Sequence, residues 1–572
     1  MAGDGSVSRW GLSLIALLIF LFLLSFTTNA PAGTSAAGQA KVDRLVMGLI
    51  TPYHDYVRPW INGTADHNIQ HDPMLEWLFE VDPATGQVLP WLAEKATLGA
   101  DGRSWTIQLR KGVQFHHGFG ELTVKDVVHN HALWCDDNYP GRKDPPTSGY
   151  REGICAVERL EVINDHEFVM RCKVACLDVP FYYSSASNVM IFSKQQWDAE
   201  GEAGYERKPA GTGPYMFKER QLGRYVLYER APPPHWKHGV VDWKELQMTW
   251  TLEESTRYAH LLAGETHLTE LNKDLTDELV GKGYKLIRSR GTAQQVQIIF
   301  GGLYFGTEDP QKKRYAESGG TTGKLDPSVP WTNKKVRQAM NKAINREELR
   351  QVLYKGRADL MYVHGFYPDL EGWDPTWKQR FAEMYGYDPA AAKRLLAEAG
   401  YPKGFKAKAW LYPFAGAPEL IPLVESIQIQ LREIGIELEL EEADWVAAVR
   451  PKLRDRKAQG YLFPLPPSKK AVESQLAFNT GKNIIHQFET DELYAMWEEL
   501  LQLTDPKARD AQLRKIGNYK FENFEVIPLF NVYIEVIVDP KIVADWPFPG
   551  WDGGDVGHTA LIQACKQEKP CR

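Results

Sequence analysis

The sequence predicts an α/β fold that contains more than one folded unit. The chain has 572 residues, of which 43% are hydrophobic and 25% charged, an ordinary globular composition over a length greater than one typical domain. In its second half, helical patterns alternate with apolar strands, which is typical of an α/β unit. In its first half, strands bounded by Gly, Asp and Asn turns are more frequent.

The first half of the chain shows period-two strands and shorter helical patterns. Ser104 to Arg110 alternates apolar and polar residues after the turn Asp101-Gly102, and Thr123 precedes a helical pattern as its N-cap. The elements predicted here are strands over 45–50, 104–110, 214–228 (as a pair), 284–287 and 295–300, helices over 67–79, from 124 and over 253–263, and a hairpin over 157–172.

The second half of the chain shows longer helices. Val336, Met340 and Ala343 lie on one face of a predicted helix, and Gly400 followed by Pro402 ends another. Residues 307–329 are polar and Gly-rich, which predicts a loop or linker. The elements predicted here are helices over 335–353, 389–399 and 418–434, strands over 407–411 and 436–442, a long helical region over 491–524 and a strand over 527–538.

The N-terminus has the pattern of a secretory signal peptide. A short polar start containing Arg9 precedes an apolar run from Leu12 to Phe26, and the small residues Ala30-Pro31-Ala32 follow. Because the run is shorter than the roughly 20 residues of a spanning helix, we expect a signal peptide over residues 1–32, cleaved near Ala32, with an uncleaved anchor as the alternative. No Cys directly follows the run, which favours the periplasm over a lipid-tethered surface.

Six cysteines follow the signal pattern, an even number that favours disulfides in an oxidising compartment. A thiolate metal site is the alternative, which export disfavours, and spacing alone does not fix the connectivity. The short intervals suggest the pairs Cys135 with Cys155, Cys172 with Cys176, and Cys565 with Cys571.

Charge and motifs argue against several classes of function. The net charge of -7 disfavours a nucleic-acid partner. The chain lacks Gly-x-Ser-x-Gly, His-Glu-x-x-His and P-loop motifs, and Gly211-Thr212-Gly213 is better interpreted as a tight turn, so we predict no catalytic residue. His67 and His71 are spaced to share a helix face, but no carboxylate or thiol completes a metal-ligand pattern. We therefore expect no metal and no cofactor.

Short phrases spread in order from residue 89 to residue 530 carry a family resemblance. They are Leu89-Pro90-Trp91-Leu92-Ala93-Glu94, Gly211-Thr212-Gly213-Pro214-Tyr215 and the stretches 101–106, 109–116, 122–128, 336–347, 388–396, 504–509 and 527–530. Together they resemble the family 5 extracellular solute-binding proteins, the dipeptide, oligopeptide and nickel receptors of ABC importers. Because these residues form strand ends, Gly turns and helix faces, the resemblance bears on the fold more than on the ligand.

The resemblance implies a two-lobed periplasmic-binding-protein fold (class II-like) with an additional third domain. Closure of the two lobes about a hinge would capture a small solute without covalent chemistry and signal to the ABC permease in the cytoplasmic membrane. We expect a monomer. The predicted divisions are a discontinuous lobe I over 41–70, 208–295 and 525–572, an extra domain II over 71–207, and lobe II over 296–524.

Aromatic side chains on lobe-facing loops are the predicted solute contacts. A site of this kind buries its ligand between aromatic walls and a few fixed polar groups, whereas core packing is the alternative interpretation for each residue. The candidates are Tyr53, Trp60, Trp410, Tyr412, Tyr461 and Phe463, with Tyr182 and Tyr183 as weaker ones.

The resemblance also bears on the solute. In the family's peptide receptors, a carboxylate in a second-lobe segment pairs with the α-amino group of the ligand, whereas the counterpart here, residues 461–470, has no Asp or Glu and contains Lys469 and Lys470. Because a buried ammonium without a counter-ion costs roughly several kcal/mol, we expect a solute other than a simple cationic-ended peptide. An oligosaccharide, a modified peptide or an anionic compound would fit.

Two other functions stay open at this point. One is an exported hydrolase whose acid and base groups are brought together only by the fold. The other is a nickel or haem receptor of the same family.

Overall fold

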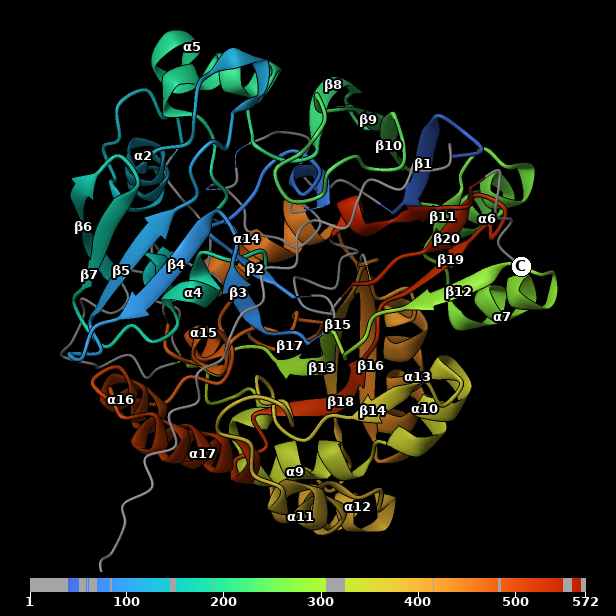
Figure 1. Cartoon of the computed structure of the whole chain (residues 1–572). Helices are drawn as coiled ribbons and strands as arrows, with labels where there is room; N and C mark the ends of the chain where they lie inside the picture. The colour runs from blue at the N-terminus through green and yellow to red at the C-terminus, as the bar shows by residue number, and fades with distance from the viewer. Residues whose placement is uncertain are drawn as a thin grey trace, which may run out of the picture. The chain divides into compact units, whose positions relative to one another are not determined.

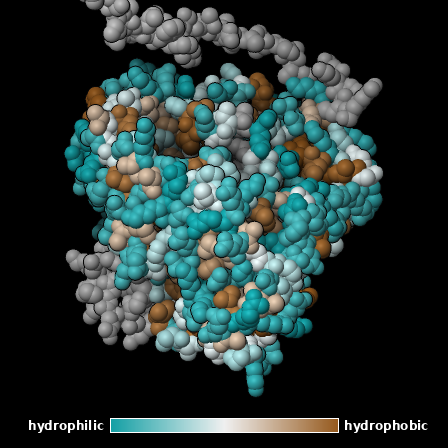
Figure 2. Space-filling model, turned by 90° about the horizontal axis from the view of Figure 1, so that it is seen from below, coloured by the Kyte–Doolittle hydropathy of each residue, from teal (hydrophilic) through white to brown (hydrophobic). Residues whose placement is uncertain are grey.

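The computed structural model describes residues 40–50, 58, 60, 69–82, 85–144, 151–187, 189–304, 325–414, 416–481, 485–548 and 558–566 (Figure 1). The expected signal peptide, Tyr53, Cys571 and most of the predicted 307–329 loop lie outside these residues. Within them, we find no helix whose length and apolar character would suit a membrane crossing. On the face shown in Figure 2, hydrophobic residues are scattered among hydrophilic ones.

A seven-stranded sheet combines segments from both ends of the chain. β1 (Arg44–Leu49) pairs in parallel with β10 (Glu245–Trp250) and β11 (Leu268–Thr269), and it buries Leu45, Met47 and Leu49, as its apolar pattern predicted. The full strand order is β12 (Lys285–Arg288), β19 (Glu535–Val538), β11, β1, β10, β9 (Tyr225–Arg230) and β8 (Tyr215–Gln221).

A six-stranded sheet forms the second large core. α13 (Leu420–Glu433) connects the parallel strands β15 (Phe405–Leu411) and β16 (Ile436–Glu442), which is the predicted α/β arrangement. The full order is β14 (Ala358–Leu360), β18 (Val526–Val532), β13 (Gln294–Phe300), β17 (Tyr461–Leu465), β15 and β16. The surrounding helices include α9 (Lys334–Lys342), α10 (Arg346–Tyr354), α11 (Thr376–Tyr385), α12 (Pro389–Glu398), α14 (Arg450–Arg454), α15 (Val472–Leu476), α16 (Asp491–Leu500) and α17 (Pro506–Glu522).

A four-stranded antiparallel sheet is built from residues that lie between β1 and β8 in the sequence. Its order is β4 (Ala93–Leu98), β5 (Ser104–Leu109), β7 (Glu167–Cys172) and β6 (Val157–Asn164), which confirms the predicted hairpin. Neighbouring helices are α2 (Val124–Cys135), α3 (Arg151–Ile154), α4 (Val179–Tyr182) and α5 (Lys194–Arg207). The short pairs β2 (Phe79–Val81) with β3 (Val88–Pro90) and β20 (Val543–Asp545) with β21 (Gln563–Ala564) complete the sheets of the described residues.

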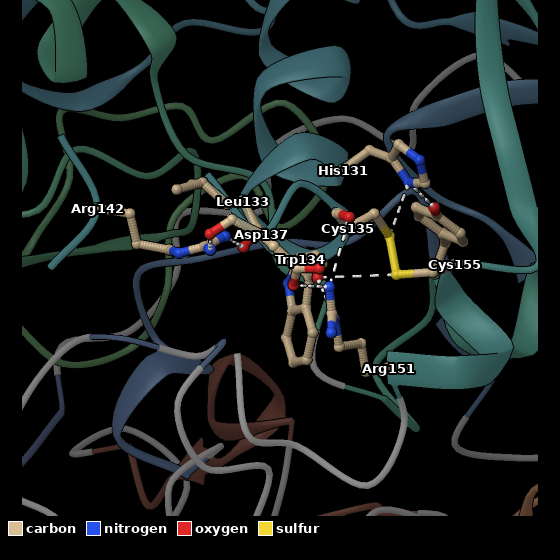
Figure 3. The surroundings of a disulfide bond; sticks show 9 residues. His131, Leu133, Trp134, Cys135, Asp137, Arg142, Arg151 and Cys155 are labelled. Carbon is tan, nitrogen blue, oxygen red and sulfur yellow. Dashed lines mark hydrogen bonds and ion pairs between the residues drawn. A yellow bond between two sulfur atoms is a disulfide. The ribbon is translucent and has the colours of Figure 1, made fainter. Parts of the chain in front are cut away.

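Two of the three predicted disulfides are present. Cys135–Cys155 joins the end of α2 to the segment before β6, and Cys172–Cys176 closes a short loop after β7. Figure 3 shows Arg151 beside the first bridge, where its Nε donates to the carbonyl of Trp134 at 3.0 Å. The pair Cys565 with Cys571 includes a residue outside the described part of the chain and stays a prediction.

The glycines of the predicted tight turn allow two backbones to approach closely. A Cβ on Gly211 would lie 1.9 Å from the carbonyl oxygen of Met74, and one on Gly213 would lie 2.6 Å from that of Pro73. The turn leads into the strand β8 rather than a helix, so it has the role of a packing contact.

Four predicted elements were wrong in extent. The helix expected over 67–79 ends at His71, because Pro73 disfavours helical backbone at the residue before it, and Phe79 begins β2 instead. The helix expected over 335–353 is two helices, since the side chain of Asn345 accepts from Glu348 N at 3.2 Å and caps α10.

The other two differences lie near the C-terminus. The helical region over 491–524 breaks between α16 and α17, where Pro506 opens a new helix. The strand expected over 527–538 is β18 and β19, which belong to different sheets. The domain boundaries implied by the resemblance stay predictions, although β13 and β18 both pair within the six-stranded sheet.

Candidate functional site

Two adjacent chain segments cross between the seven-stranded and six-stranded sheets. One runs from β12 to β13 and the other from β18 to β19. Ser289 N donates to the carbonyl of Ile534 at 2.9 Å, and Ile534 N donates to Ser289 Oγ at 3.1 Å. A short two-segment crossing of this kind can bend while the pairing within each sheet is kept, so it is the candidate hinge.

Buried charges lie where the seven-stranded sheet meets the six-stranded sheet. Lys273 Nζ, at the start of α7 (Lys273–Gly281), lies 3.4 Å from Glu419 Oε1 and 3.2 Å from Glu535 Oε2. Nearby, Gly416 N donates to Glu270 Oε2 at 3.2 Å. Burial raises the pKa of Glu270 to about 7, although this hydrogen bond and the charges of Arg257 and Lys273 oppose the rise.

A second buried ionic contact joins two helices around the six-stranded sheet, α15 and α17, to the residue before α4, a helix that neighbours the four-stranded sheet. Arg509 Nη2 in α17 lies 2.5 Å from Asp178 Oδ2, which directly precedes α4, and 2.8 Å from Glu473 Oε2 in α15. Its Nε lies 3.2 Å from Glu371. Burial raises the pKa of Glu473 to about 8, with Asp178 adding to the rise and Arg509 opposing it.

The lysine-bearing segment that replaces the expected carboxylate runs beside the hinge. After β17, Pro467 O accepts from Gln295 N at 2.9 Å and Lys469 N donates to Ala293 O at 2.6 Å. The Lys469 ammonium pairs with Asp369 and lies 5.2 Å from the ring centroid of Tyr367. Asp369 is therefore already paired with a cation of the protein.

The side chain of Lys470 contacts the segment that follows α4. Its side chain is 2% exposed, and its ammonium donates to the carbonyl of Ala186, which follows α4. Three buried hydroxyls have no hydrogen-bond partner among the described residues: Ser187 Oγ beside Ala186, Ser474 Oγ in α15, and the OH of Tyr367, the ring near Lys469. Buried hydroxyls of this kind are normally paired, so they are available to a polar ligand or to water.

Four of the six predicted aromatic contacts lie together, three of them on the paired strands β15 and β17 and Tyr412 directly after β15. The ring centroids of Trp410 and Tyr461 are 4.3 Å apart and stacked, and Phe463 lies 6.0 Å from Trp410. Tyr412 OH donates to the carbonyl of Pro464. Since all of these except Tyr461 are fully buried, this cluster packs β15 against β17, and direct solute contact by its members stays a prediction.

The remaining aromatic candidates lie elsewhere. Trp60 is fully buried, with its ring 5.9 Å from Phe192 and 6.4 Å from Tyr205. Tyr182 and Tyr183 are buried at α4, and the hydroxyl of Tyr183 lies 2.7 Å from His131 Nδ1. Tyr53 lies outside the described residues.

Sequence reasoning did not find the buried ionic contacts. Asp178 and Arg509 are 331 residues apart, and neither has a local pattern that distinguishes it from a surface charge. The two residues can be recognised as partners only when the fold is known. Among the described residues, no group of three or more His, Cys, Asp and Glu side chains is placed to hold a metal ion.

Comparison with known proteins agrees with this architecture. Residues 87–481 match the family model described as bacterial extracellular solute-binding proteins, family 5 Middle. Heme-binding protein A of Haemophilus influenzae is 26% identical over 479 residues, which cover 78% of this chain and 80% of that protein. Di/tripeptide-binding protein 1 of Pseudomonas aeruginosa is 26% identical over 408 residues, covering 68% and 69% respectively.

A solved structure shows the same fold. The ABC transporter-associated periplasmic binding protein DppA from Helicobacter pylori, in complex with the peptide STSA, superposes with a TM-score of 0.74 at 20% identity. The match covers 91% of this chain and 98% of that one. The two-lobed periplasmic-binding-protein fold predicted from the sequence is therefore confirmed.

Proposed function

Because the chain belongs to the family 5 bacterial extracellular solute-binding proteins and is a solute receptor of an ABC importer, we propose that its solute is a small compound with an anionic group. The solute would lie between the two lobes, and closure about the Ser289–Ile534 crossing would present it to the permease. This proposal deals with the class of solute, which family membership leaves open.

The observation that carries the proposal is the buried ammonium of Lys470, at the contact between the segment after β17 and the segment after α4. Its ammonium donates to the carbonyl of Ala186, and the residue belongs to the segment in which the resemblance places a carboxylate in the family's peptide receptors. The unpaired hydroxyls of Ser187 and Ser474 belong to the two segments joined by this contact. A carboxylate placed there would accept charge-assisted hydrogen bonds from Lys470 and further ones from the hydroxyls.

The carboxylates of the same region argue against a free α-amino group as the main anchor. Asp369 is paired with Lys469, and both Glu371 and Glu473 contact Arg509. Each of these carboxyl groups already contacts a cation of the protein, so an incoming ammonium would have to compete with Lys469 or Arg509 for it. We therefore expect peptides to bind, where they do, through their carboxyl end rather than their amino end.

A matched set of peptide derivatives tests this directly. We expect an N-acetylated tripeptide acid to raise the melting temperature as much as the free tripeptide, and the C-terminal amide to lose most of the effect. Lys470→Met should abolish the difference between acid and amide, whereas Lys403→Met, a change at an exposed lysine, should preserve it. Binding that requires the free amine and ignores the carboxylate would contradict the proposal.

The family consists of binding proteins, and we propose that this chain also releases its solute unchanged. Mass spectrometry of solute recovered after prolonged incubation checks this, since a hydrolase would return products of altered mass. The same experiment on natively purified protein would identify the solute it carries. If no peptide derivative binds and the recovered compound carries no anionic group, the proposal of an anionic solute is wrong. The function as a solute receptor would still stand.

Haem is a second candidate solute because of the similarity to the Haemophilus influenzae heme-binding protein A. Haem carries carboxylates of its own, so the Lys470 contact would suit it as well. Titration with haem separates the two cases, because stoichiometric binding shifts the haem absorption band. No shift at micromolar protein would restrict the proposal to smaller anions.

Location in the periplasm is part of the proposal. Proteins of this family act there, and the apolar run Leu12 to Phe26 followed by Ala30-Pro31-Ala32 supports export by a cleaved signal peptide. The mass of the protein purified from the periplasm should correspond to a chain beginning after Ala32. A mass that includes residues 1–32 would instead support the uncleaved anchor.

A further inference from the structure

A cavity of about 300 Å³ is lined by residues that belong neither to the six-stranded sheet nor to the Lys470 contact. Its lining residues come from the stretches 72–91, 214–238 and 558–561, which surround the β2–β3 pair. The volume is at the lower end of the range for small-molecule sites. Neither family membership nor the proposed solute site gives this cavity a role.

Trp77 and Trp91 line the cavity, and hydrogen bonds fix the orientation of both rings. Trp91 Nε1 donates to Glu76 Oε1 at 2.7 Å, and Trp236 Nε1 donates to Glu76 Oε2 at 3.0 Å. The rings of Trp91 and Trp236 meet edge to face at 5.2 Å. Trp77, which also lines the cavity, is held by its Nε1 donating to Ser187 O at 3.1 Å. The walls are therefore preorganised.

A cation already lies over one of these rings. The ammonium of Lys237, an exposed residue on the rim, is 5.3 Å from the centroid of Trp91. This distance is within the range of a cation–π interaction, which is stronger for a cation that is desolvated. The Trp91 face is thus able to hold a positive charge, and the protein's own side chain competes for it.

The charges of the lining favour a positive ligand. Four carboxylates line the cavity, those of Asp72, Glu76, Glu80 and Asp82, against the cations Lys237 and His558.

His558 is charged because of its two acidic neighbours. Its Nε2 lies 3.0 Å from Glu80 Oε1, and its backbone N donates to Asp72 Oδ1 at 3.1 Å. Burial lowers the pKa of His558, but Glu80 and Asp72 outweigh it and raise the pKa to about 9. Among the lining side chains, the four carboxylates thus outnumber the two cations, and Glu76 also lies 3.5 Å from His235 outside the lining.

From the juxtaposition of the fixed Trp91 face, Trp77 and an excess of carboxylates in one cavity, we propose a second binding site, for a small organic ammonium ion. The apolar part of the ligand packs between the tryptophans and Leu89, and its ammonium replaces that of Lys237 over Trp91, near Glu76. An anion is excluded by the same carboxylates. The two sites therefore have opposite charge preferences.

Isothermal titration of the full exported chain with phenethylammonium, and with phenylacetate as the anionic counterpart, tests this site. We expect saturable binding of the amine and none of the acid. Lys237→Ala removes the competing cation and should tighten amine binding about threefold or more. Lys173→Ala, a change at an exposed lysine that does not line the cavity, should leave it unchanged.

Location is checked by hydrogen exchange. The amine should slow exchange in residues 72–82 and 235–239, and Lys470→Met should not affect its binding. Equal binding of amine and acid, no saturable binding, or the same affinity in Lys237→Ala and Lys173→Ala would overturn the proposal. None of these results bears on the anionic solute site, whose test uses Lys470.

Discussion

The backbone of Ser289 and that of Ile534 are joined by a hydrogen bond of 2.9 Å, and the Ser289 side chain returns a second one by accepting from Ile534 N at 3.1 Å. Both residues are buried, and both lie where the chain passes between the two large sheets. The crossing is thus held by a residue whose side chain also donates to Gly291 O at 2.7 Å. This small hydroxyl couples the two crossing segments.

Ser289→Ala should destabilise the protein through the crossing. The change leaves the buried amide of Ile534 without its acceptor, which costs about 1–3 kcal/mol of unfolding free energy. Urea unfolding measures this loss. Ser426→Ala, at a half-buried helical serine whose hydroxyl donates to the carbonyl of Pro422, should change the unfolding free energy by less than about 0.5 kcal/mol. Equal effects of the two changes would remove the special role of Ser289.

The buried carboxyl of Glu270 should make stability depend on pH. Its pKa is about 7 in the folded protein, raised by burial, and near 4.5 when unfolded, so the folded state binds more protons between these values. Stability contributed by this group is therefore present below about pH 4.5 and lost as the pH rises through 7.

Glu270→Gln separates this effect from the rest of the protein. The amide oxygen can still accept from Gly416 N, but it does not ionise. Relative to the natural chain, the variant should gain of order 1–3 kcal/mol of stability between pH 4.5 and 7.5, measured by denaturant unfolding at several pH values. A stability difference that stays constant over this range would show that Glu270 does not titrate there.

Local patterns predicted the strands well where one segment forms one strand. The prediction for 436–442 coincides with β16, and the apolar run 45–50 predicted β1, which buries Leu45, Met47 and Leu49. The prediction over 527–538 failed for a different reason. Its apolar run is continuous, but β18 pairs with β13 and β19 pairs with β12, and this division depends on partners more than 200 residues away.

The candidate site shows the same limit. The sequence identifies Trp410 and Tyr461 as two separate candidate contacts, whereas in the structure their rings are stacked, because both belong to strands of one sheet. Trp60 was chosen on the same grounds and packs in another aromatic cluster. Lys470 stood out only as the residue type that replaces a family carboxylate, and its contact with Ala186 depends on how distant segments meet. Residue type identified chemistry, whereas placement required the fold.

Arg509 should be among the most sensitive charged residues of the protein. Replacing it by Leu leaves Asp178, Glu473 and Glu371 close together without their cation. Breaking a buried ion pair in this way costs about 3–5 kcal/mol, which chemical unfolding would report. Arg394→Leu, at an exposed position of α12, should stay within about 0.5 kcal/mol of the natural chain.

The charge argument for Arg509 also predicts partial rescue. If the loss comes from uncompensated carboxylates, the double change Arg509→Leu with Asp178→Asn should recover part of the stability, since Asp178 lies 2.5 Å from Arg509 and would lose its cation. At low pH, where carboxyls are protonated, the difference between Arg509→Leu and the natural chain should shrink. A pH-independent loss without rescue would indicate lost packing instead.

The two described disulfides should contribute unequally because they close loops of different length. In the chain-entropy view, a bridge stabilises by restricting the unfolded chain, and the restriction grows with the logarithm of loop length. Cys135–Cys155 spans 20 residues and Cys172–Cys176 spans 4. Replacing both cysteines by Ser should therefore cost about 3 kcal/mol for the first pair and about 2 kcal/mol for the second.

Urea unfolding of the two double variants measures these losses, and comparison with the reduced natural chain provides the control. Arg151 should limit the loss of unfolding free energy in the variant without Cys135–Cys155, because its hydrogen bond to the Trp134 carbonyl holds the end of α2 without the bridge (Figure 3). Arg151→Ala in the Cys135→Ser, Cys155→Ser background should then cost more than in the natural chain. Additive losses would show that the bridge and Arg151 act independently on this segment.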